Sequence, residues 1–181
     1  MIIYAHGLQL NKSDVSSKGQ LLSSELGAIV PDLPVYPDAA IATLERQILT
    51  HSKVMLVGHS LGGFYMTYLA EKYDDLPVML TNPVVRPQRS PLLKSIVGND
   101  ETLKDAVAAK LAAYDVPITK PNNFWVMLQR ADDVLNYQDA LEHYKHCNLV
   151  VLNGGSHKFD DFQYWLPILS YFYQRHYGRN P

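Results

Sequence analysis

The sequence predicts an α/β fold with three layers, in which a mostly parallel sheet of six strands lies between helices. Short apolar runs alternate with longer amphipathic segments along the chain. The short runs are apolar at successive positions, which is typical of parallel strands covered by helices on both faces. The expected strands are 2–5, 29–35, 54–57, 78–81, 124–128 and 149–152. The second of them contains Pro31 and Pro34, which favour an edge position because proline cannot donate to a sheet ladder.

The expected helices carry apolar side chains at intervals of three and four residues. In segment 39–50, for example, Ile41, Leu44 and Ile48 lie on one helical face. The remaining helices are expected at 19–28, 61–73, 137–145 and 161–176. Each helix except the last would lead from one strand to the next by a right-handed crossover.

Segment 86–121 breaks the alternation, because one helix would suffice between the flanking strands. Two helices are expected there instead. Ser90 and Pro91 suit the N-cap and first position of one helix, and Asn99 or Asp100 suits the N-cap of the other. These helices would form either a short cap over the sheet or a surface elaboration. The whole chain, 1–181, is otherwise expected to form a single domain.

Composition excludes several classes of partner. The 181 residues carry a formal net charge of −2 without a basic patch, so no nucleic-acid partner is expected. No apolar run approaches the roughly 20 residues of a membrane span, and the first residues enter a strand pattern without a signal peptide. The single cysteine, Cys147, allows no internal disulfide. A cytoplasmic protein is therefore expected, and its oligomeric state stays open.

A serine, an acid and a histidine follow three of the expected strands. Ligands of parallel α/β sheets bind at the carboxyl ends of the strands, so Ser60, Asp132 and His157 are expected at one rim. Ser60 is the centre of Gly-His-Ser-Leu-Gly, residues 58–62, which matches the G-x-S-x-G nucleophile elbow. The glycines allow a strand and a helix to approach closely, and the hydroxyl then stands at a helix N-terminus that favours a developing anion. The alternative is a glycine-rich turn with a capping serine.

A serine hydroxyl becomes a strong nucleophile when a base removes its proton. His157 is the best candidate base, because its glycine-flanked loop follows the last strand. His59 adjoins the serine but should point away from the hydroxyl. His143, His146 and Cys147 could form a metal cluster, yet no second ligand pair accompanies them, so a solvated helix face is favoured and no metal or cofactor site is predicted.

The third member of the constellation must orient the imidazole and stabilise its charge. Asp132 is favoured because it is the first acid after its strand. The neighbouring Asp133 could instead cap the helix that begins near Tyr137. Asp160 and Asp161 suit the N-cap of the final helix. An oxyanion hole in such a fold uses two backbone N–H groups. One belongs to the residue after the serine, which is Leu61, and the other comes from the loop after the first strand, where Leu8 is expected to supply it.

Five motifs together resemble the small YqiA-like bacterial esterases of the α/β-hydrolase superfamily. They are YAHGL from Tyr4, LVGHSLGGFYMTYLA from Leu56, NPVVRP from Asn82, ADDVLNY from Ala131 and NGGSHKF from Asn153. The resemblance implies an abbreviated fold without the first two strands of larger hydrolases. It also implies esterase activity on acyl esters, with acyl thioesters such as acyl-CoA as a further substrate class. The expected two-step acyl transfer needs no cofactor, and an apolar cap would favour small or medium acyl chains. Carried over by motif, the triad is Ser60, Asp132 and His157.

Other interpretations remain open at this point. Arg86, in the NPVVRP motif, could bind an acidic part of a substrate, although a structural ion pair is favoured. The second helix of segment 86–121 could present Leu103, Val107 and Leu111 as an exposed apolar face. The chain would then be a non-catalytic or weakly catalytic protein-interaction module. The same triad could also serve a small peptidase or amidase.

Overall fold

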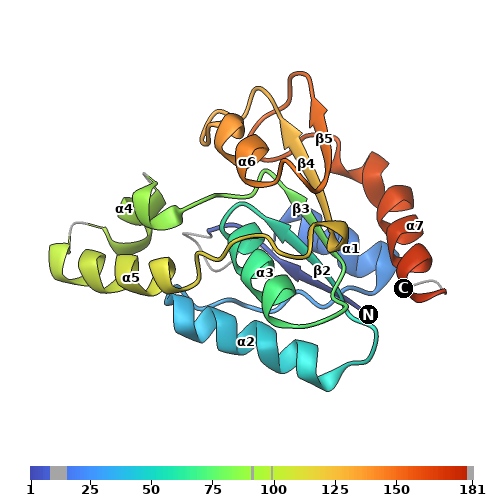
Figure 1. Ribbon diagram of the computed structural model, residues 1–181, viewed down its shortest axis with the longest axis horizontal. Helices are drawn as coiled ribbons and strands as arrows, with labels where there is room; N and C mark the ends of the chain where they lie inside the picture. Colours follow the sequence, from blue (N-terminus) through green and yellow to red (C-terminus); the bar gives the residue numbers. More distant parts are fainter. Residues whose placement is uncertain (9–15, 91, 99, 179–181) are drawn as a thin grey trace.

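The computed structural model describes residues 1–8, 16–90, 92–98 and 100–178 (Figure 1). Within these residues the structure has a five-stranded sheet whose order follows the sequence. The strands are β1 (Ile2–Ala5), β2 (Met55–His59), β3 (Val78–Thr81), β4 (Phe124–Gln129) and β5 (Asn148–Leu152). Each strand is parallel to its neighbours, so all five carboxyl ends meet at one edge of the sheet. The predicted α/β class and parallel sheet are confirmed.

The expectation of a sixth strand at 29–35 is wrong. Only Ile29 pairs with the sheet, as an isolated parallel bridge to Ile3 on the outer side of β1. Its N–H donates to the Ile2 carbonyl at 2.9 Å, and its carbonyl accepts from the Tyr4 N–H at 2.9 Å. The prolines at 31 and 34 lack the N–H groups that further pairing would need. The segment therefore takes the expected edge position without forming a strand.

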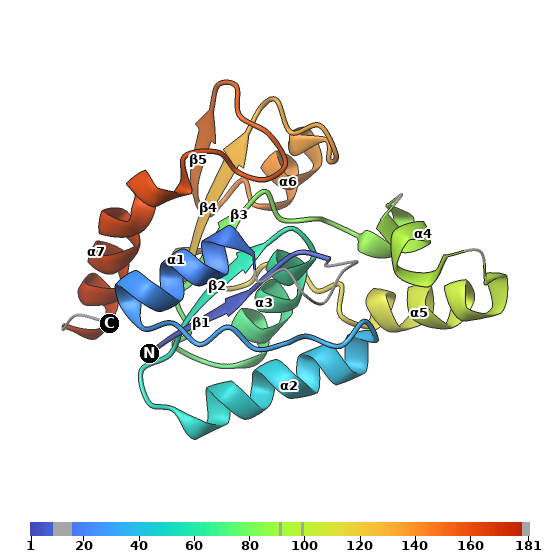
Figure 2. The same cartoon turned by 180° about the vertical axis from the view of Figure 1, so that it is seen from behind.

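Helices cover both faces of the sheet. The α-helices among the described residues are α1 (Ser17–Leu26), α2 (Pro37–Thr50), α3 (Leu61–Lys72), α4 (Leu92–Val97), α5 (Glu101–Ala113), α6 (Tyr137–His143) and α7 (Leu166–Tyr177). The two opposite views place α1 and α7 on one face and α2 and α3 on the other (Figures 1 and 2). This gives the three layers that the sequence predicted.

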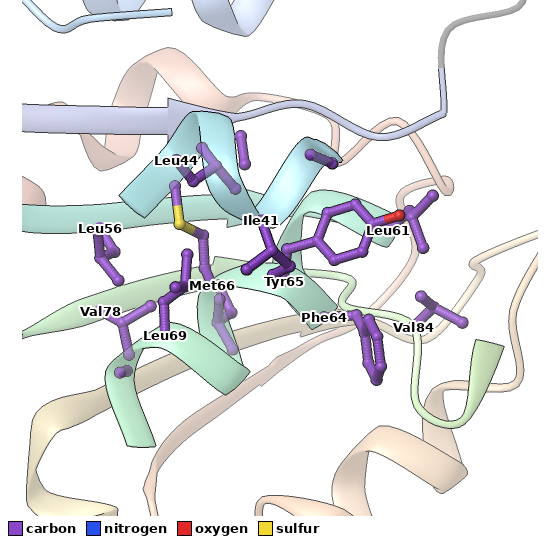
Figure 3. Packing of buried hydrophobic residues seen from close by; sticks show 14 of the residues in the cluster. Ile41, Leu44, Leu56, Leu61, Phe64, Tyr65, Met66, Leu69, Val78 and Val84 are labelled. Atoms are coloured by element: carbon purple, nitrogen blue, oxygen red, sulfur yellow. The ribbon is translucent and has the colours of Figure 1, made fainter. Parts of the chain in front are cut away.

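The core is divided by the sheet into two clusters. Successive strand side chains point to opposite faces. Ile3 and Leu56 therefore join the cluster under α2 and α3, whereas Ile2 and Tyr4 join the cluster under α1 and α7. Figure 3 shows the first cluster, where side chains of α2 and α3 such as Leu44 meet the strands. Burial on both faces explains why the strand sequences are apolar throughout.

The final helix begins later than expected. A short 3₁₀ turn, η3 (Phe162–Trp165), precedes α7, which starts at Leu166. Asp161 has a φ of 62° and its side chain caps neither element. Asp160 instead accepts a hydrogen bond from the Ser156 hydroxyl at 2.8 Å. The predicted N-cap role of these two acids is therefore wrong.

Segment 86–121 contains a 3₁₀ turn, η1 (Pro87–Arg89), followed by α4 and α5. The carboxylate of Asp100 accepts from the Leu103 N–H at 2.9 Å and caps α5, as predicted. Two further expected positions, Pro91 at the start of the first helix and Asn99 as an alternative N-cap of the second, lie outside the described residues. Both views show α4 and α5 beyond the end of the sheet where β1 finishes (Figures 1 and 2).

The apolar face of α5 is turned inward. Val107 and Leu111 are buried in the α2–α3 side of the core, and Leu103 packs against it. Polar contacts also join α5 to α2. The Asp38 carboxylate of α2 accepts hydrogen bonds from the Tyr114 hydroxyl and from Lys110 Nζ, both at 2.7 Å. The exposed apolar face that an interaction module would use is therefore not present, and that expectation is corrected.

Two buried tyrosines offer a matched test of core polarity. The Tyr65 hydroxyl is buried and has no hydrogen-bond partner in the described part of the chain, whereas the Tyr144 hydroxyl bonds to Thr67 at 2.8 Å. An unsatisfied buried hydroxyl costs about 1–3 kcal/mol, and a satisfied one stabilises by about 1 kcal/mol. We expect Tyr65→Phe to leave the free energy of unfolding unchanged or raise it, and Tyr144→Phe to lower it by about 1 kcal/mol. Urea denaturation measures both, and equal losses would contradict the assignment.

Candidate active site

The predicted serine, histidine and acid meet at the carboxyl edge of the sheet. Ser60 follows β2, Asp132 lies after β4, and His157 lies after β5. The His157 Nε2 atom is 2.9 Å from the Ser60 Oγ atom. The other ring nitrogen, Nδ1, is 2.9 Å and 3.1 Å from the two carboxylate oxygens of Asp132. A continuous chain of hydrogen-bonding groups thus links three residues that are far apart in the sequence.

Ser60 occupies a sharp turn between β2 and α3. Its φ of 53° lies in the left-handed region that non-glycine residues rarely adopt. Backbone bonds hold it there: the Ser60 N–H donates to the Thr81 carbonyl, and the Ser60 carbonyl accepts from the Val84 N–H, both at 3.2 Å. Its side chain makes no capping bond to α3. The alternative of a capping serine is therefore not what the structure contains, and the hydroxyl faces His157 instead.

The glycines beside the turn are required by close approach. A Cβ atom at position 62 would lie 2.2 Å from the Ala5 carbonyl oxygen, and one at position 58 would lie 2.7 Å from the Gly63 Cα atom. Neither neighbour is a flexible side-chain end, so larger residues cannot be accommodated without moving backbone. Gly62 allows the N-terminus of α3 to approach the end of β1, and Gly58 allows it to approach β2.

The two residues expected to form the oxyanion hole line the same small cavity. Leu61 is the first residue of α3, so its N–H has no partner within the helix. The loop after β1 passes directly over Ser60, since a Cβ atom at Gly7 would lie 3.0 Å from the Ser60 Cβ atom. Leu8 and Leu61 both line a cavity of about 40 Å³. Their predicted role is compatible with this arrangement and stays a prediction.

The two neighbouring acids after β4 have different partners. Asp132 Oδ1 accepts from the N–H groups of Val134 and Leu135, at 2.9 and 2.8 Å, in addition to facing the imidazole. Asp133 accepts from the backbone N–H of His157 at 2.9 Å, and this bond lowers the pKa of the Asp133 carboxyl. Asp133 does not cap α6, because the N-cap of that helix is Asn136, whose side chain accepts from the Gln138 N–H. Both acids therefore hold His157, one by its ring and one by its backbone.

His59 points away from the nucleophile, as the sequence predicted. Its Nδ1 atom lies 3.0 Å from the Thr81 carbonyl oxygen, and its ring centroid lies 5.2 Å from that of His157. Burial, together with the positive charge of Lys18, holds the pKa of His59 well below its ordinary value. His59 is therefore neutral in the folded protein near neutral pH.

Three buried polar residues at the site were missed by the sequence argument. Asn82 follows β3, Gln129 ends β4, and Lys18 lies on α1. The first two carry the same signal that identified Asp132, a polar residue at the carboxyl end of a buried strand. Lys18 donates to the Lys158 carbonyl, and burial lowers its pKa to about 8. Its position in an amphipathic helix gave no sign of this contact.

A cavity of about 910 Å³ lies beside the site rather than on it. Its walls include Val84 and Val134, whose N–H groups bond to Ser60 and Asp132, but Ser60 itself is not a lining residue and is only 3% exposed. Arg86 also lines it, with Nε 4.0 Å from Asp115 Oδ2, which supports the ion-pair interpretation.

The trio of His143, His146 and Cys147 lines this same cavity. Among the residues that the structure describes, no group of three or more histidine, cysteine or acidic side chains is arranged to hold a metal ion. Burial raises the pKa of the Cys147 thiol to about 12. The expected solvated helix face is wrong, because α6 ends at His143, whereas His146 and Cys147 lie beyond it and Cys147 packs against the core.

Comparison with known proteins identifies the family. The model of the uncharacterised protein family UPF0227 matches residues 1–174. The chain belongs to this family. UPF0227 is the YqiA-like family, so the resemblance carried by the five sequence motifs is confirmed. Among the described residues, no helix has the length and apolar character needed to cross a membrane.

Solved α/β-hydrolase structures share the fold of this UPF0227 member. MGS-MChE2, an α/β hydrolase from lagoon sediments of Mar Chica in Morocco, has a TM-score of 0.67 at 18% identity, covering 96% of this chain and 90% of its own. Est1E of Butyrivibrio proteoclasticus, solved with ferulic acid, scores 0.70 at 10% identity over 98% and 89%. The monoacylglycerol lipase of Paleococcus ferrophilus scores 0.66 at 13% identity over 97% and 94%. At these identities the likeness establishes the α/β-hydrolase fold.

Replacing Gly62 by alanine tests the close approach of α3 and β1. The added methyl group would meet the Ala5 carbonyl, so we expect a loss of at least about 3 kcal/mol in the free energy of unfolding. Gly27 is a suitable control, because it has a φ of 62° but no atom within 4 Å of an added Cβ. Gly27→Ala should cost only about 1–2 kcal/mol. Urea denaturation measures both losses. If the two variants lost similar free energies of unfolding, the contact between position 62 and Ala5 would not be the cause of the destabilisation.

Burial of neutral His59 makes stability depend on pH. Below pH 6.5 the unfolded chain binds a proton at this residue that the folded protein does not, so the free energy of unfolding falls as pH falls. Between pH 6.5 and 5.5 we expect the wild-type protein to lose about 1 kcal/mol more than His59→Gln, which cannot titrate. Urea denaturation at several pH values measures the difference. Parallel pH curves for the two proteins would contradict the assignment.

Proposed function

We propose that this protein is a serine hydrolase that cleaves acyl esters through a covalent acyl-enzyme. The observation that carries the proposal is the pair of contacts made by His157, at 2.9 Å to the Ser60 hydroxyl and 2.9 Å to the Asp132 carboxylate. This is the geometry that a nucleophile, a general base and an orienting acid require.

In the first half of the proposed reaction, His157 Nε2 takes the proton of Ser60 as Oγ attacks the ester carbonyl carbon. The carbonyl electron pair moves onto oxygen, and the N–H groups of Leu8 and Leu61 donate to this oxyanion. Asp132 stabilises the imidazolium without itself taking the proton. His157 then protonates the leaving alcohol or thiol as its bond to the acyl carbon breaks, which leaves the acyl group on Ser60.

Water completes the cycle by the reverse sequence. His157 removes a proton from a water molecule that attacks the acyl carbon, and the same two N–H groups hold the second oxyanion. When the bond to Ser60 breaks, His157 returns the proton to Oγ. The products are a carboxylic acid and the free enzyme. An acyl thioester follows the same path with a thiol as the leaving group.

Two observations favour an esterase over the other candidates. The apolar face of α5 that an interaction module would expose is buried against the core. Solved structures that share the fold include one named as a monoacylglycerol lipase and one described as a metagenome-derived lipolytic enzyme. The ester, thioester and amide alternatives differ only in the leaving group, so a set of 4-nitrophenyl esters, acyl thioesters and 4-nitroanilides with one acyl chain separates them. We expect the rate to be greatest for the esters.

A fluorophosphonate probe tests the nucleophile directly. We expect the native protein to be labelled and Ser60→Ala to remain unlabelled. His157→Ala and Asp132→Asn should lower the labelling rate and kcat by about 10³ to 10⁴-fold, because base and orienting acid act as a unit. The 4-nitrophenyl esters give the matching steady-state rates.

The controls address folding and access. Circular dichroism and thermal unfolding of each variant establish that the loss is chemical. Because Ser60 is only 3% exposed, labelling is also measured with a small fluorophosphonate and a long-chain one. A folded native protein that neither probe labels and that hydrolyses none of the esters would overturn the proposal.

A further inference from the structure

We infer that Asn82 and Gln129 are positioning residues that set the distance between the base and the nucleophile. Asn82 directly follows β3, and Gln129 is the last residue of the neighbouring strand β4. Both side chains form hydrogen bonds with the loop that carries His157. The inference rests on the proposed function, since it assigns a role relative to the same serine and histidine.

Asn82 contacts the backbone of the base itself. Its Nδ2 donates to the carbonyl of Ser156 at 2.9 Å and to that of His157 at 3.3 Å. Its Oδ1 accepts from the backbone N–H of Gln129 at 2.9 Å. The residue is only 2% exposed, so none of these bonds is replaced readily by water. Asn82 therefore links the end of β4 to the loop after β5.

Gln129 closes the same loop from the other side. Its Oε1 accepts from the N–H groups of Ser156 and Asp160, at 3.1 and 2.9 Å, and its Nε2 donates to the Asp160 carbonyl at 3.0 Å. These contacts bracket His157 between the two ends of the loop. A Cβ atom at Gly155 would lie 2.1 Å from Gln129 Oε1, so the backbone packs directly on the amide.

The residues on either side of Asn82 also hold Ser60. The Thr81 carbonyl accepts from the Ser60 N–H, and the Val84 N–H donates to the Ser60 carbonyl, both at 3.2 Å. Ser60 and His157 are thus tied to adjacent residues of one short stretch, 81–84. Displacement of reacting groups by about 1 Å can cost a hundredfold in rate, so this shared attachment bears on catalysis.

The chemistry requires amides at both positions. Each side chain must both donate and accept hydrogen bonds, whereas an ionised carboxylate can accept them but cannot donate. At residue 82 a carboxylate would face two carbonyl oxygens. Asp is otherwise a close substitute there, because Asn82 has a φ of 41° and both residue types tolerate the left-handed region. Asn82→Asp therefore removes the donor with little change in volume or backbone preference.

Asn82→Asp is the test, and Asn148→Asp is its matched control. The Asn148 Nδ2 donates to the Phe124 carbonyl at 3.0 Å, so the control also breaks an amide bond to a backbone carbonyl, at the opposite end of the sheet. Gln129→Glu is a second variant that keeps the acceptor atoms and removes the donor. Active-site concentration is taken from the endpoint of fluorophosphonate labelling, so that unfolded protein does not count.

We expect Asn82→Asp to lower kcat per labelled site by about 10- to 100-fold for a 4-nitrophenyl ester, with KM changed by less than about threefold. The second-order labelling rate should fall by a similar factor, because it also depends on proton removal by His157. Gln129→Glu should lower the same two quantities. Asn148→Asp should leave both within about twofold of wild type.

Other outcomes overturn the inference. If Asn82→Asp and Gln129→Glu lower the melting temperature but keep wild-type kcat per labelled site, the amides are structural only. If all three substitutions lower kcat equally, the effect is not specific to the His157 loop. If the wild-type protein is neither labelled nor active, the proposed function fails first, and that result is distinct from loss in the variants alone.

Discussion

The turn at Ser60 is the constraint on which the active edge of the molecule depends. Its backbone has a φ of 53°, and the neighbouring helix approaches β1 so closely that Gly62 has no room for a side chain. Because of this approach, the N-terminus of α3 and the loop after β1 meet at one point. Ser60, the Leu61 N–H and the residues around Gly7 are brought together by backbone geometry before any side chain contributes.

The second half of the site is held by buried polar groups instead. The His157 loop is hydrogen-bonded to Asn82, Gln129, Asp133 and Lys18, which come from three different parts of the chain. In a low-dielectric interior such bonds are individually strong, and an unpaired partner is costly. A network of this kind fixes a loop more tightly than apolar packing, which tolerates small shifts.

Segment 86–121 is integrated with the core rather than attached to it. Leu111 is fully buried, and Asp38 of α2 bonds to both Lys110 and Tyr114. The large cavity lies between the start of this segment and α6, next to residues that bond to the triad but not at Ser60 itself. Substrate preference in the proposed reaction would then depend on side chains from elements that the alternating strand–helix pattern does not explain.

The sequence by itself determined the fold class and the three central residues. Apolar strands indicated a parallel sheet, and glycines at fixed spacing around Ser60 indicated a strand-to-helix turn, because both are local steric requirements. Parallel strands end at one edge, so Asp132 and His157 could be expected beside the serine. The prediction of a sixth strand was wrong. It rested on the apolar content of 29–35, but Pro31 and Pro34 lack the N–H groups that pairing beyond Ile29 would need.

Tertiary structure decided how the other buried polar groups pair. Asp132 and Asp133 are adjacent in sequence, yet one faces the imidazole and the other binds its backbone. Asn82 lies 75 residues from His157, and Lys18 lies 140 residues from Lys158. The periodicity of apolar residues in the sequence indicates whether a side chain is buried or exposed, but it does not indicate which residue of another strand or loop the side chain contacts. Those pairings depend on strand order and loop path, which long-range packing sets.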